Sequence, residues 1–124
     1  MSEVVVDERY AAGLAGLDGF SHVLVVFYMH MSSWDPSSDL IRRPQGRLDM
    51  PLVGIFAQRA KHRPNPIGVT AAELIKIHAN VVEVRGLDAI DGTPVLDLKP
   101  YFPAYDCRDA RTPPWVDVLM REYF

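Results

Sequence analysis

A cationic, proline-containing segment, Phe56–Gly68, holds the densest group of side chains that could bind a ligand. It reads FAQRAKHRPNPIG, and its two X-Pro pairs disfavour helix and favour extended backbone. Arg59, Lys61 and Arg63 alternate with other residues, so an extended chain would project all three from the same side. This spacing indicates either a site for an anionic or electron-rich ligand or a solvated basic loop.

A second group of candidate residues stands at the end of an apolar run. Val23–Tyr28 is apolar on both faces, which is typical of a central strand that is covered on both sides. His30 follows this run, so its ring would lie at the C-terminal end of the strand. Polar side chains in that position commonly contact ligands, although a histidine there can also be a hydrogen-bonded structural residue.

Three carboxylates, Asp88, Asp91 and Asp97, lie close together in the stretch LDAIDGTPVLDLKPY. They could be interpreted as a metal cluster, but aspartates around an Asp-Gly turn more often cap the turn or lie at the surface. No Cys/His spacing resembles a zinc site, and the single cysteine excludes an internal disulfide. We therefore expect no metal.

Length and charge limit the classes of protein that the chain can belong to. A length of 124 residues predicts one domain over residues 1–124. The formal net charge of −3 argues against nucleic-acid binding through bulk charge alone, so an RNA partner would need a local cationic patch. There is no apolar leader and no apolar run near the roughly 18 residues of a membrane span, which predicts a soluble, cytoplasmic protein without membrane contact.

The expected elements are mainly strands, with short helices at either end. A helix capped by Asp7 would place Tyr10, Leu14 and Leu17 on one face, and a second helix would start at Thr112. The segment between residues 31 and 49 is predicted to be a long loop with a short strand. The predicted strands are Val4–Val6, Val23–Tyr28, Leu40–Arg42, Leu52–Phe56, Val69–Ile77, Val81–Leu87 and Val95–Leu98. The final helix would present Trp115, Val118, Leu119 and Glu122 at helical spacing.

Three strings of residues, taken in order, carry a resemblance to a known family. GLDGFSHVLVVFYMH, VGIFAQRAKHRPNPIG and LDAIDGTPVLDLKPY closely resemble the TsaA-like (TrmO) family of S-adenosylmethionine-dependent tRNA methyltransferases, over roughly residues 4–106. The resemblance implies a small, single-domain β-barrel with flanking short helices that forms a homodimer. It also implies methyl transfer to N6 of a threonylcarbamoyl-modified adenosine beside the tRNA anticodon.

The resemblance also implies roles for individual residues. The S-adenosylmethionine pocket would be formed by His30, Met31, Arg59, Leu74, Thr93, Pro94, Val95 and Leu96. The tRNA substrate would be contacted by Arg63, Asn65, Pro66 and Tyr101. Because an N6 nucleophile must lose a proton, His30 is the first candidate for the general base and Asp91 is the second.

The match to the family pattern is incomplete. Typical members begin with a segment resembling P-I-G-x-I-x-S-P and a PRQPGL-like stretch that helps to bind the cofactor, and many bacterial members add a C-terminal domain. The sequence given has neither, and the FATRS pattern of the family reads FAQRA here. We therefore keep two further hypotheses: a methyltransferase that acts on a small molecule or another substrate, and a non-catalytic cofactor-binding module.

Overall fold

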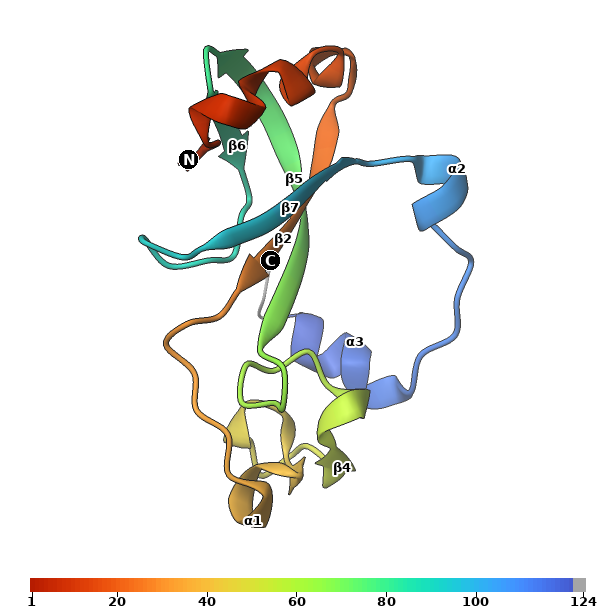
Figure 1. Ribbon diagram of the computed structural model, residues 1–124. Coiled ribbons are helices and arrows are strands. Elements are labelled where there is room, and N and C mark those ends of the chain that lie inside the picture. The colour runs from red at the N-terminus through yellow and green to blue at the C-terminus, as the bar shows by residue number, and fades with distance from the viewer. Residues whose placement is uncertain (122–124) are drawn as a thin grey trace. The chain divides into compact units, whose positions relative to one another are not determined.

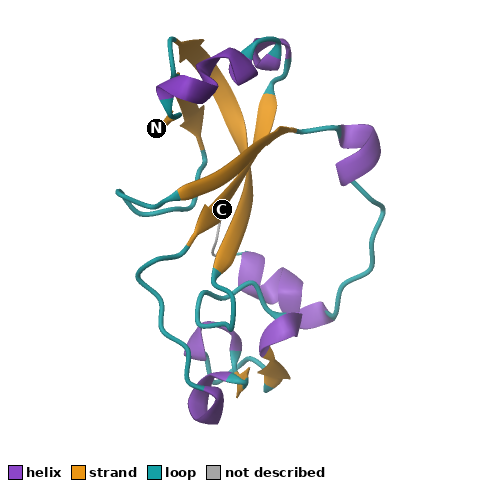
Figure 2. Cartoon of the chain, in the orientation of Figure 1, coloured by secondary structure: helices purple, strands orange, loops and turns teal. Residues whose placement is uncertain are grey.

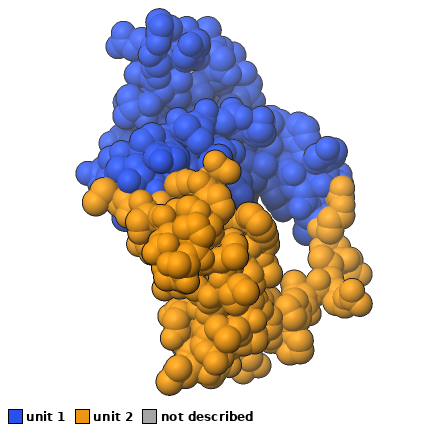
Figure 3. Space-filling model, turned by 60° about the horizontal axis from the view of Figure 1, so that its bottom comes forward, with its two compact units in different colours: residues 1–30, 67–107 blue, residues 31–66, 108–124 orange. Residues whose placement is uncertain are grey.

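The computed structural model describes residues 1–121, and the chain groups into two compact units (Figure 3). Unit 1 comprises residues 1–30 and 67–107, and unit 2 comprises residues 31–66 and 108–124. Each unit is described by itself below. One domain over the whole chain stays a prediction.

Unit 1 contains a five-stranded, curled antiparallel sheet that forms a half-barrel (Figures 1 and 2). The strand order across the sheet is β1-β6-β5-β2-β7, so β1 and β7 are the two edges. The bounds are β1 Ser2–Val5, β2 His22–Tyr28, β5 Ile67–His78, β6 Val81–Arg85 and β7 Val95–Pro100. The prediction of a mainly β fold is confirmed. The sheet is open between its two edges.

The centre of the sheet follows from the apolar pattern of β2, which pairs with β5 on one side and β7 on the other. Val23, Val25 and Phe27 are buried, because alternate residues of a strand face the same side. The prediction that β2 is covered on both faces is only partly right, since Leu24 and Val26 on the second face are half-buried. The buried core consists of Val4, Val23, Val25, Phe27, Ala72, Val82 and Val84.

One glycine of the sheet is required by close packing. Gly68 lies opposite Phe27 in the β2–β5 register, with the Phe27 ring over it. A Cβ atom at position 68 would lie 2.5 Å from both Cε2 and Cζ of that ring. The last residue of the RPNPIG string is therefore a packing residue of the core.

Short helices and turns connect the strands of unit 1. Asp7 accepts a hydrogen bond from the backbone N–H of Arg9 and caps a 3₁₀ helix, Glu8–Leu14, which is followed by a second 3₁₀ helix, Leu17–Gly19. Leu14 and Leu17 pack against the core as expected, but Tyr10 is exposed. The predicted helical face is wrong at Tyr10, because a 3₁₀ helix has three residues per turn rather than 3.6. The remaining helix of this unit is α2, Pro103–Asp106.

Unit 2 consists mostly of loops and short elements. They are α1 Pro36–Asp39, β3 Ile41–Arg42, β4 Val53–Gly54, α3 Pro114–Met120 and two 3₁₀ helices, Pro44–Gly46 and Ile55–Ala57. Met50, Ile55 and Pro44 are buried in this unit. The strand predicted over Leu52–Phe56 is shorter than expected, because the chain turns into a 3₁₀ helix after Gly54. The predicted position of Glu122 lies outside the described residues.

A last property of the described residues concerns helix length. The longest helices of residues 1–121, among them Glu8–Leu14 and α3, have seven residues each. A helix needs about 20 predominantly apolar residues to cross a bilayer. No described helix is long and apolar enough to do so.

Candidate functional site

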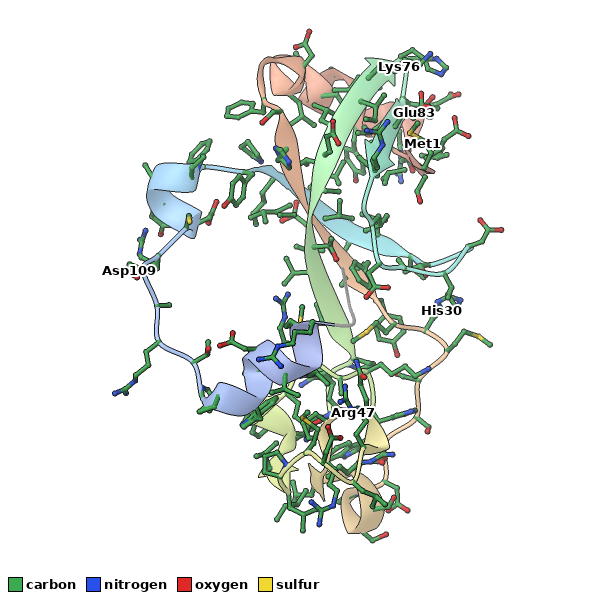
Figure 4. The ribbon with its side chains drawn as sticks, turned by 180° about the vertical axis from the view of Figure 1, so that it is seen from behind. Met1, His30, Arg47, Lys76, Glu83 and Asp109 are labelled. Carbon is green, nitrogen blue, oxygen red and sulfur yellow. The ribbon has the colours of Figure 1, made fainter. Side chains whose placement is uncertain are left out.

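The C-terminal end of β2 meets the turn that leads into β7. The backbone N–H of Tyr28 donates to the carbonyl of Pro94 at 2.9 Å, and the N–H of His30 donates to the carbonyl of Tyr28 at 2.9 Å. His30 is exposed where the chain leaves β2 (Figure 4). Unit 1 therefore brings the end of β2, which His30 follows, next to the predicted Thr93–Leu96 segment.

The turn that precedes β7 has a fixed backbone geometry. Gly92 has a φ of +83°, in the left-handed region that side-chain-bearing residues rarely adopt. Both the backbone N–H and the hydroxyl of Thr93 donate to the carbonyl of Ile90. The β2–β7 register then shifts between Val26 and Phe27, which leaves Leu96 as an extra, exposed residue. The DGTPVL string is thus a hydrogen-bonded turn that ends in a bulge.

We expect Gly92→Ala to lower the free energy of unfolding by about 1–2 kcal/mol, because alanine is strained at a positive φ. Urea unfolding monitored by circular dichroism measures the change. Gly13→Ala is the matched control, since Gly13 has no positive φ and a Cβ atom added there would meet no atom within 4 Å. Equal stability of the two variants would show that the turn adapts to a side chain.

Apolar side chains next to this turn are exposed. Ile67 lies opposite Tyr28, and Val69 lies opposite Val26, so their side chains share one face of the sheet. Tyr28 is 42% exposed, Ile67 49% and Val69 43%. The sequence pattern did not assign Ile67 or Val69 to the site. Their position depends on the β2–β5 register, although the apolar character of the start of β5 is visible in the sequence.

Two predicted site residues lie at the other end of the same strands. Leu74 packs against the core, and its N–H donates to the carbonyl of Ser21 at 2.8 Å, just before β2 begins. His30 lies just after β2 ends, and the seven residues of β2 span about 20 Å. The structure therefore separates Leu74 from His30 and the turn.

Tyr101 is also remote from the turn, because it follows the C-terminal end of β7. It lines an open hollow of about 600 Å³ together with Phe20, His22 and Phe102. The rings of Phe20 and Phe102 stack with centroids 5.7 Å apart, and His22 bonds to the hydroxyl of Ser21 at 2.8 Å. Tyr101 and the Thr93–Leu96 segment are at opposite ends of one strand.

The predicted site residues Met31, Arg59, Arg63, Asn65 and Pro66 belong to unit 2. Residues 61–65 form successive bends, and the N–H of Arg63 donates to the carbonyl of Lys61 at 3.0 Å. The expectation of an extended segment is therefore wrong at these positions. The X-Pro pairs exclude helix, but the segment closes on itself instead of extending.

Side chains of the same segment hold this bent conformation. The guanidinium of Arg63 donates to the carbonyls of Gln58 at 2.9 Å and Ala60 at 3.2 Å. His62 bonds through Nδ1 to the carbonyl of Ser33 at 3.0 Å. Arg63 thus has a defined structural function within its own loop, which the alternating charge pattern did not indicate.

Groups of acidic, histidine and cysteine side chains give no metal site in the part of the chain that the structure describes. Within residues 1–121, no three such side chains are placed to hold a metal ion. Asp97, one of the three carboxylates singled out above, pairs with Lys99 at 2.7 Å, and that hydrogen bond lowers the pKa of Asp97 below its ordinary value. Asp97 is therefore engaged in an exposed ion pair.

Comparison with known proteins decides the family. The model of the tRNA-methyltransferase O N-terminal domain matches residues 1–107. The chain belongs to this family. In this chain of the TrmO family, the DGTP turn and the end of β2 lie side by side, as described above.

Named relatives and a solved structure of the TrmO family are similar to the chain. An S-adenosyl-L-methionine-binding protein of Archaeoglobus fulgidus is 36% identical over 107 residues, which are 86% of this chain and 73% of that protein. The tRNA (adenine(37)-N6)-methyltransferase of Mus musculus is 44% identical over 93 residues, which are 75% of this chain but 21% of that enzyme. The crystal structure of TrmO from Pseudomonas aeruginosa has a TM-score of 0.71 at 34% identity, and the match covers 90% of this chain and 47% of that one. The chain thus spans less than half of the last two proteins.

Proposed function

We propose that the chain is an S-adenosylmethionine-dependent methyltransferase domain that methylates N6 of a threonylcarbamoyl-modified adenosine beside the anticodon of tRNA. The support is membership of the TrmO family together with relatives that are named for S-adenosylmethionine binding and for methylation of adenine 37 of tRNA. The structural observation that carries the proposal is the contact between the end of β2 and the turn before β7, joined by the Tyr28–Pro94 hydrogen bond.

The residues at this contact fit the cofactor. The turn presents exposed backbone beside apolar side chains of Tyr28, Ile67 and Val69, which suit the purine ring and the methylthio part of the ligand. The Tyr28 ring also offers a π face to a sulfonium cation. When bound, S-adenosylmethionine supplies an activated methyl group, and the protein orients it and limits water access.

His30 is the proposed general base. It is exposed at the end of β2, within the group of residues proposed for the cofactor, and an imidazole nitrogen can accept a proton. Asp91, exposed in the adjoining turn, is the second candidate. The general base would accept the proton that N6 of the adenine loses, either during methyl transfer or after it.

The remaining assignments rest on the resemblance alone. They are Met31, Arg59 and Leu74 at the cofactor, and Arg63, Asn65, Pro66 and Tyr101 at the substrate. Leu74 packs against the core, whereas Ile67 and Val69 are exposed. We therefore propose Ile67 and Val69, in place of Leu74, as apolar contacts of the cofactor. We also propose a homodimer, and a cytoplasmic location where tRNA is modified.

The deciding experiment is titration calorimetry of the purified chain with S-adenosylmethionine, with the solution mass measured on the same sample. We expect binding and a dimeric mass. Methylation of threonylcarbamoyl-modified tRNA, followed by mass spectrometry of the nucleosides, then tests the substrate. Cofactor binding without tRNA methylation would favour a different substrate, and a folded chain without cofactor binding would favour a non-catalytic module.

A further inference from the structure

The net charge of −3 is the sum over regions of opposite charge. Unit 1 carries ten carboxylates and four Lys or Arg residues, which gives a formal charge of −6. Residues 31–66 of unit 2 carry three carboxylates and six Lys or Arg residues, which gives +3. The chain is therefore acidic as a whole but has one strongly cationic segment.

The few cations of unit 1, all of whose residues the structure describes, are neutralised by ion pairs. Lys76 pairs with Glu83 at 3.9 Å across the β5–β6 hairpin (Figure 4). The other three pairs are Arg9–Asp7, Arg85–Glu73 and Lys99–Asp97. Because each cation of unit 1 has a carboxylate beside it and six carboxylates remain in excess, this unit repels a polyanion.

Each carboxylate of residues 31–66 takes part in an ion pair or hydrogen bond within the segment. Asp39 is buried and pairs with Arg42 at 2.9 Å, and Asp49 pairs with Arg47 at 2.7 Å. Asp35 accepts hydrogen bonds from the N–H and hydroxyl of Ser37 at the start of α1. These carboxylates therefore serve the local structure of the segment, whose formal charge is +3.

Two of the remaining cations are oriented by neutral groups. Arg43 donates to the carbonyl of Met50, and Arg63 donates to the carbonyls of Gln58 and Ala60. A carbonyl orients a guanidinium without removing its charge. Lys61 lies between these anchored positions and is exposed. The segment thus presents positive charge on a backbone that is held in place.

An exposed aromatic ring accompanies these charges. Phe56 is 80% exposed, three residues before Arg59 in the same segment. Single-stranded nucleic acid is bound by this combination, in which cations follow the phosphates and an aromatic ring stacks on a base. A duplex would offer phosphates but no free base face to the ring.

We propose that residues 31–66 form the RNA-binding surface of the chain, with Lys61 contacting phosphate and Phe56 stacking on an unpaired base of a single-stranded loop. This inference rests on the proposed function for the choice of RNA as the polyanion. It names the segment that binds the RNA and excludes the acidic sheet of unit 1 from phosphate contact.

The test compares two charge reversals that change the net charge of the chain equally. Lys61→Glu alters the cationic segment, and Lys76→Glu alters an exposed lysine of unit 1. The probe is a fluorescein-labelled RNA hairpin with a single-stranded loop, and fluorescence anisotropy is recorded over a series of salt concentrations. We expect Lys61→Glu to weaken binding several-fold and to lower the salt slope by about 0.7, the value for one phosphate contact on a single strand. Lys76→Glu should leave the slope unchanged.

Phe56→Ala tests the stacking contact separately. We expect the affinity for the hairpin to fall at least about fivefold with an unchanged salt slope, since stacking involves no counterion release. The same variant should bind a duplex of equal length as the wild type does. Thermal unfolding of all variants shows whether they are folded.

Equal effects of the two charge reversals, or no RNA binding by the wild type, would overturn the proposal. Equal loss of hairpin and duplex binding in Phe56→Ala would overturn the stacking contact. Calorimetry with S-adenosylmethionine on the same samples separates this failure from failure of the proposed function, because cofactor binding does not depend on Lys61 in either proposal.

Discussion

His30→Ala is expected to slow methyl transfer in a single turnover by at least about 100-fold, the lower end of the contribution of a positioned general base. The affinity for S-adenosylmethionine should change much less, because the turn before β7 and the side chains of Tyr28 and Ile67 remain. Rapid-quench kinetics with excess enzyme over modified tRNA measures the rate, and calorimetry measures the affinity. The expected signature is a loss in rate without an equal loss in binding.

His78→Ala is the matched control for this experiment. His78 is also an exposed histidine of unit 1, but it ends β5 at the β5–β6 turn, far along the sheet from the DGTP turn. We expect the single-turnover rate of His78→Ala to equal that of the wild type. A single-turnover rate unaltered by His30→Ala would remove His30 from the mechanism, and Asp91→Asn would then be the variant to measure.

Gly68→Ala should lower the free energy of unfolding by about 1–3 kcal/mol, the usual cost of forcing extra atoms into a packed core. The new Cβ would lie 2.5 Å from two atoms of the Phe27 ring, which is nearly fully buried and cannot swing into solvent. Urea unfolding measures the effect as a lower midpoint at an unchanged slope. Gly19→Ala, which meets no atom within 4 Å, is the control and should change stability little.

The double variant Phe27→Leu/Gly68→Ala identifies the cause of the loss. If the ring is the obstacle, the two substitutions should cost less together than the sum of their separate costs, because the smaller side chain makes room for the methyl group. Additive costs would mean that Gly68 is needed for another reason, such as its backbone in β5.

Much of unit 1 could be predicted because its strands and turns have the residue types that favour those structures locally. β2, β6 and β7 are rich in β-branched and apolar residues with period two. This pattern is local, so it can be recognised without knowing which strands pair. Pro100 is the last residue of β7, and it is tolerated within the strand because β7 is an edge strand. The DGTP turn was recognisable because Asp-Gly pairs mark turns.

The site was less predictable because it depends on strand register and on loop closure. Leu74 and Val69 lie in one strand and are both apolar, and only pairing with β2 shows that Val69 is near Tyr28 while Leu74 is near Ser21. Arg63 was expected among projecting cations, but its guanidinium bonds to carbonyls of its own loop. Such bonds follow from the final path of the backbone, which alternating charges do not encode.

The position of β1 has a consequence for how the chain acquires its structure. β1 pairs with β6, with Val4 opposite Val82, and the side chain of Asn80 donates to the carbonyl of Val6 from 74 residues further along. Pairing between such distant segments slows folding, because the entropy of closing the intervening loop is lost before the contacts form. During synthesis, β1 therefore leaves the ribosome long before its partner. We expect it to stay unpaired, and open to chaperones, until residue 85 has emerged.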